Sequence, residues 1–247
     1  MRRSMLLFQA MLAMLLVGCA SSAPPAAEPT SAAPTAAAES VSFAAADGVT
    51  VTGRLHGTGT TAVVLSNMGD NDPAAWESFA PTVAARGYAV LTYSYRYPIR
   101  TPSLTAAMAR GAVDDLRGAV TFVRARGASR VVLIGASLGG MATAKVAGAQ
   151  KADAAVVIAA PADRPDFDLR VDDAEVSAIT GPSLFIASDN DTTVPAVETR
   201  RLFDLAPQPK RWHTFASAAH GTLLLDTAFA EDFRRVLLDF VTRTTPS

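Results

Sequence analysis

The chain has 247 residues, of which 49% are hydrophobic and 18% charged. It is therefore too apolar for a disordered protein and long enough to bury a substantial core. Its 22 Lys and Arg residues against 23 Asp and Glu give a formal net charge of -1, without the basic excess typical of nucleic-acid-binding proteins. The single cysteine excludes an intramolecular disulfide and a cysteine-rich zinc or iron–sulfur site.

Residues 1–18 have the pattern of an export signal. Two arginines precede an apolar run from Met5 to Val17, which is too short to span a bilayer comfortably and suits the core of a signal peptide. The run ends in Leu16-Val17-Gly18-Cys19, which resembles the lipobox of bacterial lipoproteins. That resemblance implies an exported protein, lipid-anchored to the membrane of the cell envelope through Cys19. The alternative is an ordinary cleavable secretory signal.

The next segment, residues 19–40, consists mainly of Ala, Pro, Ser and Thr. Because it has almost no large apolar side chains, it cannot offset its own ordering entropy and is predicted to be a disordered tether. The folded part is then a single domain over residues 41–247.

The pattern within this domain predicts an α/β fold. Residues 41–43 and 49–51 alternate apolar and polar side chains around Asp47-Gly48, which indicates a hairpin. Short, wholly apolar segments follow, typical of strands buried on both faces of a parallel sheet; they are residues 62–65, 88–91, 131–134, 155–158 and 184–187. Helical patterns separate them, at residues 76–86, 105–126, 138–150, 194–205 and 228–242. This alternation predicts a mostly parallel central sheet with helices on both faces.

A candidate nucleophile lies where the apolar segment 131–134 meets the following helix. The sequence there is Gly135-Ala136-Ser137-Leu138-Gly139-Gly140, a Gly-x-Ser-x-Gly pattern in strand–turn–helix context. Small neighbours let strand and helix approach closely, so that the Ser137 hydroxyl stands above the sheet. The alternative is a glycine-rich turn that binds phosphate. However, the sequence here has neither the Lys of a P-loop nor the glycine spacing of a dinucleotide-binding site.

Ser137 needs a base to become a nucleophile, and the chain has three histidines. His220 lies in a loop of small residues before the last helix and is the candidate base. His56 is expected in a surface loop, and His213 in a last strand, residues 210–215.

Two aspartates, Asp189 and Asp191, follow the apolar segment 184–187, and either could orient the imidazole or cap a helix. Together with the elbow and the His220 loop, this segment resembles the α/β-hydrolase family over most of residues 49–243. Family members often carry Asp-x-x-Val-Pro at this point, which matches Asp191 to Pro195 and implies Asp191 as the acid. The order Ser, Asp, His is the one expected for that fold.

The resemblance also implies an oxyanion hole of two backbone N–H groups. Leu138 supplies one, just after the nucleophile. The second comes from the loop after residues 62–65, where the family commonly has His-Gly-x and this chain has Ser66-Asn67-Met68-Gly69-Asp70. Gly69 is the better match and Met68 the fallback. The segment from Tyr93 to Arg96 is similar to a structural site of the family.

The resemblance implies a serine esterase that cleaves carboxylic ester or thioester bonds of small-molecule acyl substrates, with neither cofactor nor metal. About twenty residues, 161–180, separate the apolar segments 155–158 and 184–187, and six of them are acidic. Such a connection is either a minimal cap over an open cleft, which favours small or exposed acyl groups, or a solvated turn without effect on substrate. An envelope acyltransferase with the same triad and a catalytically silent tethered binding protein are the alternative functions. The sequence predicts no oligomeric state.

Overall fold

The structure is a computed structural model in which residues 38–245 are described. The expected signal sequence, Cys19 and most of the expected tether lie outside these residues. The first strand begins at Glu39, slightly before the domain boundary predicted at residue 41. None of the helices within residues 38–245 is long and apolar enough to span a bilayer.

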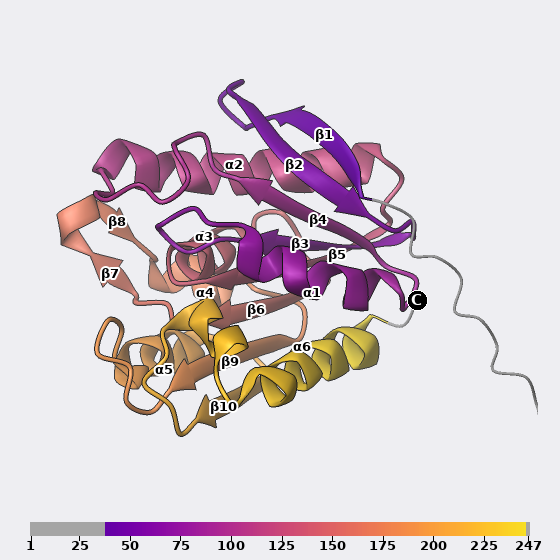
Figure 1. Cartoon of the computed structure of the whole chain (residues 1–247). Coiled ribbons are helices and arrows are strands. Elements are labelled where there is room, and N and C mark those ends of the chain that lie inside the picture. The colour runs from indigo at the N-terminus through magenta and orange to yellow at the C-terminus, as the bar shows by residue number, and fades with distance from the viewer. Residues whose placement is uncertain (1–37, 246–247) are drawn as a thin grey trace, which may run out of the picture. The chain divides into compact units, whose positions relative to one another are not determined.

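One eight-stranded sheet organises the fold, in the order β1-β2-β4-β3-β5-β6-β9-β10 (Figure 1). Its strands are β1 (Glu39–Ala44), β2 (Thr50–His56), β3 (Thr61–Ser66), β4 (Ala89–Ser94), β5 (Arg130–Ala136), β6 (Ala154–Ile158), β9 (Ser183–Ser188) and β10 (Lys210–Phe215). β2 pairs antiparallel with β1 and β4, and every other pair is parallel. The predicted hairpin and the mostly parallel sheet are thereby confirmed.

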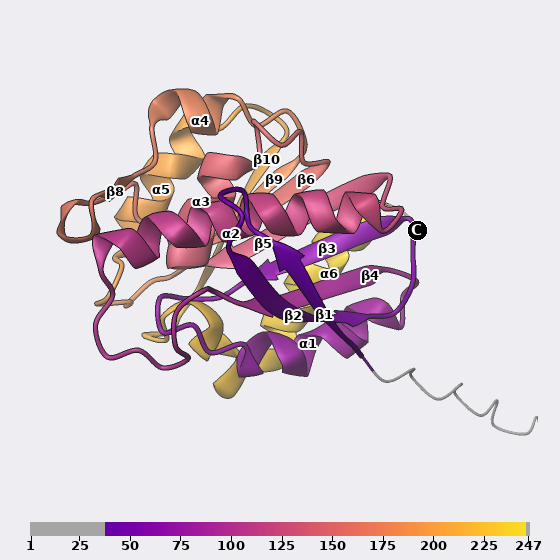
Figure 2. The same ribbon diagram turned by 90° about the horizontal axis from the view of Figure 1, so that it is seen from above.

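Helices cover both faces of this sheet (Figure 2). They are α1 (Ala74–Ala84), α2 (Ala106–Ala125), α3 (Leu138–Val146), α4 (Asp173–Ser177), α5 (Ala196–Leu205) and α6 (Ala230–Thr244). Side chains of α2 to α5 join one buried core, and those of α1 and α6 join the other. Along β3, Val64 faces the first core and Val63 the second, which explains why this strand is apolar throughout.

Two of the differences between the observed and the predicted helix ends have local reasons. α3 ends at Val146 rather than at residue 150, and the turn that follows brings Gly148 against the backbone of Ala178. α5 begins at Ala196, because the backbone of Pro195 is not helical, with φ -53° and ψ 141°.

The carboxyl ends of five parallel strands meet at one edge of the sheet. Ser66 of β3 lies beside Gly135 of β5, and Ile158 of β6 lies between Ala136 and Ile186 of β9. β10 ends beside β9 at the same level. The loops that carry the predicted site residues therefore leave the sheet from a common edge, where open α/β sheets bind ligands.

Candidate active site

Ser137 stands on a strained turn between β5 and α3. Its backbone has φ 53° and ψ -114°, a conformation that costs a non-glycine residue roughly 1–3 kcal/mol. A Cβ atom on Gly135 would lie 2.1 Å from the carbonyl oxygen of Gly139, and one on Gly139 would lie 2.5 Å from the carbonyl oxygen of Asn67. The close approach of strand, helix and neighbouring loop therefore requires glycine at both positions.

Asp191 and His220 are in direct contact. The Asp191 Oδ2 atom lies 2.7 Å from His220 Nδ1, and its Oδ1 atom accepts the N–H groups of Thr193 at 2.8 Å and Val194 at 3.1 Å. The Asp191 side chain is fully buried and that of His220 is 11% exposed. Since a carboxylate only accepts, Nδ1 carries the proton and Nε2 is left as the basic nitrogen.

The loops that carry Asp191 and His220 are joined to each other, and the loop of His220 lies against the elbow. The Ser188 hydroxyl donates to the Ala219 carbonyl at 2.7 Å. Beyond His220, a Cβ atom on Gly221 would lie 3.3 Å from the Ala136 side chain, so this loop passes next to the residue before Ser137. Within residues 38–245, however, the Ser137 hydroxyl forms no hydrogen bond with His220 or any other group. Such contacts are often loose before substrate binds.

The other candidates for acid and base lie elsewhere. Asp189 is exposed. His213 is on β10 as predicted, with its ring 4.7 Å from that of Phe215; burial, together with Arg211, lowers the pKa of His213. The expectation for His56 was wrong. It ends strand β2, is 6% exposed and contacts the carboxylate of Glu77 at 3.3 Å, because it faces α1 rather than solvent.

Backbone hydrogen bonds determine which N–H groups of the loop after β3 can face the elbow. The Asn67 carbonyl accepts the N–H of Gly139 at the start of α3. Because a trans peptide directs its C=O and N–H oppositely, the N–H of Met68 points away from α3. The N–H groups of Gly69 and Leu138 have no acceptor in the described part of the chain. Both residues line one cavity together with Ser137, and Met68 is not among its lining residues.

Three tyrosines hold the loop after β3. They alternate along β4 and beyond it, at 93, 95 and 97, and their rings pack in sequence with centroids 5.6 and 5.5 Å apart. Their hydroxyls contact the Ser66 hydroxyl at 2.8 Å, the Asn67 carbonyl at 2.7 Å and the Gly69 carbonyl at 3.2 Å, respectively. Sequence reasoning missed Tyr97, although the spacing of two residues places all three side chains on one face of a strand.

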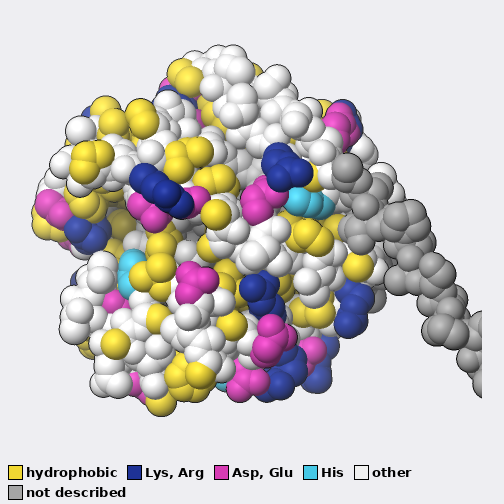
Figure 3. All heavy atoms as spheres, viewed as in Figure 1, with side chains coloured by type: hydrophobic (Ala, Val, Ile, Leu, Met, Phe, Trp, Pro, Cys, Tyr) yellow, Lys and Arg dark blue, Asp and Glu magenta, His cyan; other side chains and the backbone are white. Residues whose placement is uncertain are grey.

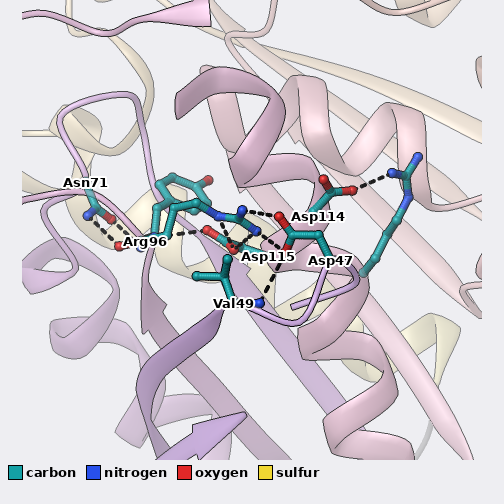
Figure 4. Close-up of polar contacts among 8 residues, drawn as sticks. Asp47, Val49, Asn71, Arg96, Asp114 and Asp115 are labelled. Atoms are coloured by element: carbon teal, nitrogen blue, oxygen red, sulfur yellow. Dashed lines mark hydrogen bonds and ion pairs between the residues drawn. The ribbon is translucent and has the colours of Figure 1, made fainter. Parts of the chain in front are cut away.

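Arg96 fixes the segment that carries these tyrosines (Figure 4). Its guanidinium donates to the buried Asp115 carboxylate at 2.9 and 2.7 Å and also pairs with Asp47 near the turn of the β1–β2 hairpin. Burial raises the pKa of Asp115, against the opposing effect of the Arg96 hydrogen bonds. The contacts place this segment in a structural rather than a chemical role.

The cavity at Ser137 has a volume of about 270 Å³. Its lining combines the elbow and the loop after β3 with the segment before α2 and the connection after β6: Gly69, Asp70, Thr101, Pro102, Leu104, Ser137, Leu138, Met141, Pro161, Arg164, Phe167 and Thr193. A larger, open hollow of about 640 Å³ lies between β1, β2, β4 and α1. It contains none of the predicted site residues.

The short connection between β6 and β9 contributes directly to this cavity. It contains a two-stranded hairpin, β7 (Asp163–Arg164) with β8 (Leu169–Arg170), the single turn η1 (Pro165–Phe167) and helix α4. Its acidic side chains mainly form ion pairs and a helix cap. Because Arg164 and Phe167 line the cavity, the connection bears on the site and is not merely a solvated turn.

Residues 38–245 contain no group of three or more side chains suited to hold a metal ion. On the face drawn in Figure 3, basic and acidic side chains lie close to one another rather than in patches of one sign.

Comparison with known proteins gives the same fold. A family model described as "Alpha/beta hydrolase family" matches residues 55–245, whereas a search of curated protein sequences found no match. The esterase domain of a Rhodothermus marinus protein is 24% identical, with a TM-score of 0.66 over 84% of this chain and 99% of that chain. The alpha/beta hydrolase GrgF from Penicillium sp. sh18 is 17% identical, with a TM-score of 0.71 over 85% and 100%. An enol-lactonase from Burkholderia xenovorans LB400 is 16% identical, with a TM-score of 0.66 over 81% and 99%.

Proposed function

The chain belongs to the alpha/beta hydrolase family, and we propose that it is a serine hydrolase that cleaves carboxylic ester or thioester bonds of small acyl substrates. Ser137 is the nucleophile, His220 the base and Asp191 the acid that orients it. The observation that carries this proposal is the 2.7 Å contact between Asp191 and His220, in a loop that lies against the residue before Ser137.

In the first half of the reaction, His220 Nε2 takes the proton of the Ser137 hydroxyl as its oxygen attacks the acyl carbon. Asp191 holds the imidazole by Nδ1 and stabilises its charged form. The carbonyl oxygen becomes an oxyanion, which accepts hydrogen bonds from the N–H groups of Leu138 and Gly69. One such donor is typically worth ~10²–10³ in rate.

In the second half, the imidazolium returns its proton to the leaving oxygen or sulfur, and an acyl-enzyme remains on Ser137. Water then attacks the acyl carbon while His220 Nε2 accepts its proton. As the second oxyanion collapses, the acyl–oxygen bond breaks, the imidazolium returns this proton to the Ser137 oxygen, and the acid is released. Two features support the assignment of Gly69 over Met68 as second donor: the Asn67 carbonyl bonds to Gly139, and Gly69 lines the cavity of Ser137.

The test is covalent labelling with a fluorophosphonate, followed by hydrolysis of p-nitrophenyl butyrate by the full-length protein in detergent. We expect labelling and turnover in the wild type, and loss of both in Ser137→Ala. The control is Ser42→Ala, which changes an exposed serine on β1. Folded wild-type protein that is neither labelled nor active would instead support the catalytically silent binding protein. Product transfer to an added alcohol in preference to water would support the acyltransferase.

We further propose that the protein is exported and anchored through lipid on Cys19, on the strength of the lipobox-like sequence alone. Metabolic labelling with an alkyne fatty acid in a bacterial host tests this. Cys19→Ser should abolish labelling and leave the signal uncleaved. A wild-type protein that is secreted, cleaved and unlabelled would indicate an ordinary secretory signal.

A further inference from the structure

The cavity at Ser137 limits the size of a substrate. For comparison, a protein cavity of about 150 Å³ holds one benzene molecule, so the 270 Å³ measured here accommodates roughly ten non-hydrogen atoms on that scale. Apolar side chains make up much of the lining, among them Leu104, Met141 and Phe167. The space therefore suits a short alkyl or aryl acyl group.

Phe167 closes part of this space from the β6–β9 connection. It ends the turn η1, which packs against α2, and the guanidinium of Arg164 lies 4.4 Å from the centre of its ring. Arg164 is in turn held by Asp166, at 3.0 Å from Nε and 2.7 Å from Nη2. The stacked side chains of Arg164 and Phe167 form one wall of the cavity, and the charge of Arg164 is paired with Asp166.

The two charged side chains that line the cavity differ in how they are paired. Two lining side chains are charged, Arg164 and Asp70. The charge of Arg164 is offset by Asp166, whereas Asp70 forms no ion pair within the described part of the chain and accepts only the N–H of Asp72, at 3.4 Å. The exposed carboxylate of Asp70, next to Gly69, therefore lines the cavity without an ion-pair partner in the described part of the chain.

We propose, on the basis of the function proposed above, that the substrates are esters of short acyl groups without a negative charge. Phe167 sets the limit on length, and Asp70 disfavours anionic acyl groups. Both are specificity-determining residues, and neither takes part in the proton transfers.

The length limit is tested with p-nitrophenyl esters of increasing acyl length, since the leaving group is then constant. Burial of one further methylene strengthens binding by about fourfold, so kcat/KM should rise to about six carbons and fall at least tenfold by ten. In Phe167→Ala, the ratio of decanoate to butyrate turnover should rise at least tenfold.

The matched control is Phe203→Ala, since Phe203 on α5 carries Arg200 over its ring at 4.8 Å and does not line the cavity. If Phe167→Ala does not fold, Phe167→Leu gives a smaller shift in the same direction. An unchanged length profile in a folded Phe167 variant, or an equal shift in Phe203→Ala, would overturn the role of Phe167.

The charge limit is tested by comparing p-nitrophenyl heptanoate with the mono-p-nitrophenyl ester of adipic acid, which ends in a carboxylate. Wild type should prefer heptanoate at least tenfold at low ionic strength. Asp70→Asn should reduce this preference three- to tenfold, and added salt should shrink the difference between the two proteins.

Asp226→Asn removes another exposed acid that does not line the cavity, and it should leave the preference unchanged. An equal effect of both variants would assign the preference to the general acidity of the surface, and no effect of Asp70→Asn would exclude its role. Because turnover of the butyrate ester and fluorophosphonate labelling are measured in parallel, a failure of selectivity is distinguished from a failure of the hydrolase function itself.

Discussion

The Asn71 side chain forms hydrogen bonds with both the N–H and the carbonyl of Tyr95. Its Oδ1 atom accepts the Tyr95 N–H at 2.6 Å, and its Nδ2 atom donates to the Tyr95 carbonyl at 3.2 Å. Nδ2 also donates to the Tyr97 carbonyl at 2.6 Å. In this way a single buried side chain acts like a neighbouring strand and joins the candidate oxyanion loop to the end of β4.

We expect Asn71→Ala to lower the free energy of unfolding by about 2–4 kcal/mol, because the buried N–H of Tyr95 loses its acceptor. Asn71 has φ 61°, which Asn tolerates better than Ala. Chemical denaturation measures the change, with Asn190→Ala at an exposed position as control. A loss below 1 kcal/mol would mean that water replaces these bonds.

Tyr97→Phe should lower kcat three- to tenfold with little change in KM. The Tyr97 hydroxyl donates to the Gly69 carbonyl, so its loss loosens the loop that carries one proposed oxyanion donor, and such donors act in the transition state. Tyr88→Phe is the matched control, since the Tyr88 hydroxyl bonds to the Thr245 carbonyl, away from the site. Equal losses in both variants, or a rise confined to KM, would contradict the positioning role.

The sequence predicted the elements of this fold well, because each buried strand is a short apolar run bounded by glycine or turn residues. It also identified the strand–helix turn at Ser137, whose glycines are required by close backbone contacts, as at Gly139, and the loop of His220, where Gly221 has φ 55°. It could not place His56, because the burial of this residue depends on α1, whose Glu77 contacts the end of β2 from another part of the chain. Nor could it identify Asn71, because its role depends on loop geometry that no local pattern encodes.

Asp191→Asn should lower kcat by about 10⁴, in line with loss of the orienting carboxylate in serine hydrolases. The amide can offer its N–H₂ group to His220 Nδ1 and so favour the wrong tautomer. The matched control is Asp189→Asn, two residues away and exposed, which should keep activity within threefold. A comparable loss in Asp189→Asn would point to disruption of the whole loop.

Gly139→Ala should destabilise the protein by about 3 kcal/mol or more, because its Cβ atom would lie 2.5 Å from two backbone oxygens, those of Ser66 and Asn67. Backbone cannot move aside as a flexible side chain can. Gly69→Ala is the stability control, since its Cβ atom would meet only Leu104, at 3.5 Å. Thermal melting compares the two, and a similar Tm for both variants would show that the β3 loop can retreat from α3.

The half-buried His213 should make the protein less stable in mild acid. Its pKa is lowered in the folded state by burial and by Arg211, with Asp232 opposing, so the unfolded chain binds the proton more readily just below the ordinary value of about 6.5. Stability therefore falls as the pH drops from 6.5 towards the folded-state pKa, and this contribution is constant below it. His213→Gln, which cannot titrate, should show a smaller loss between pH 7.5 and 5 in urea denaturation. The difference between the two proteins removes the effect of other titrating groups, and parallel pH profiles would mean that the histidine is equally easy to protonate in both states.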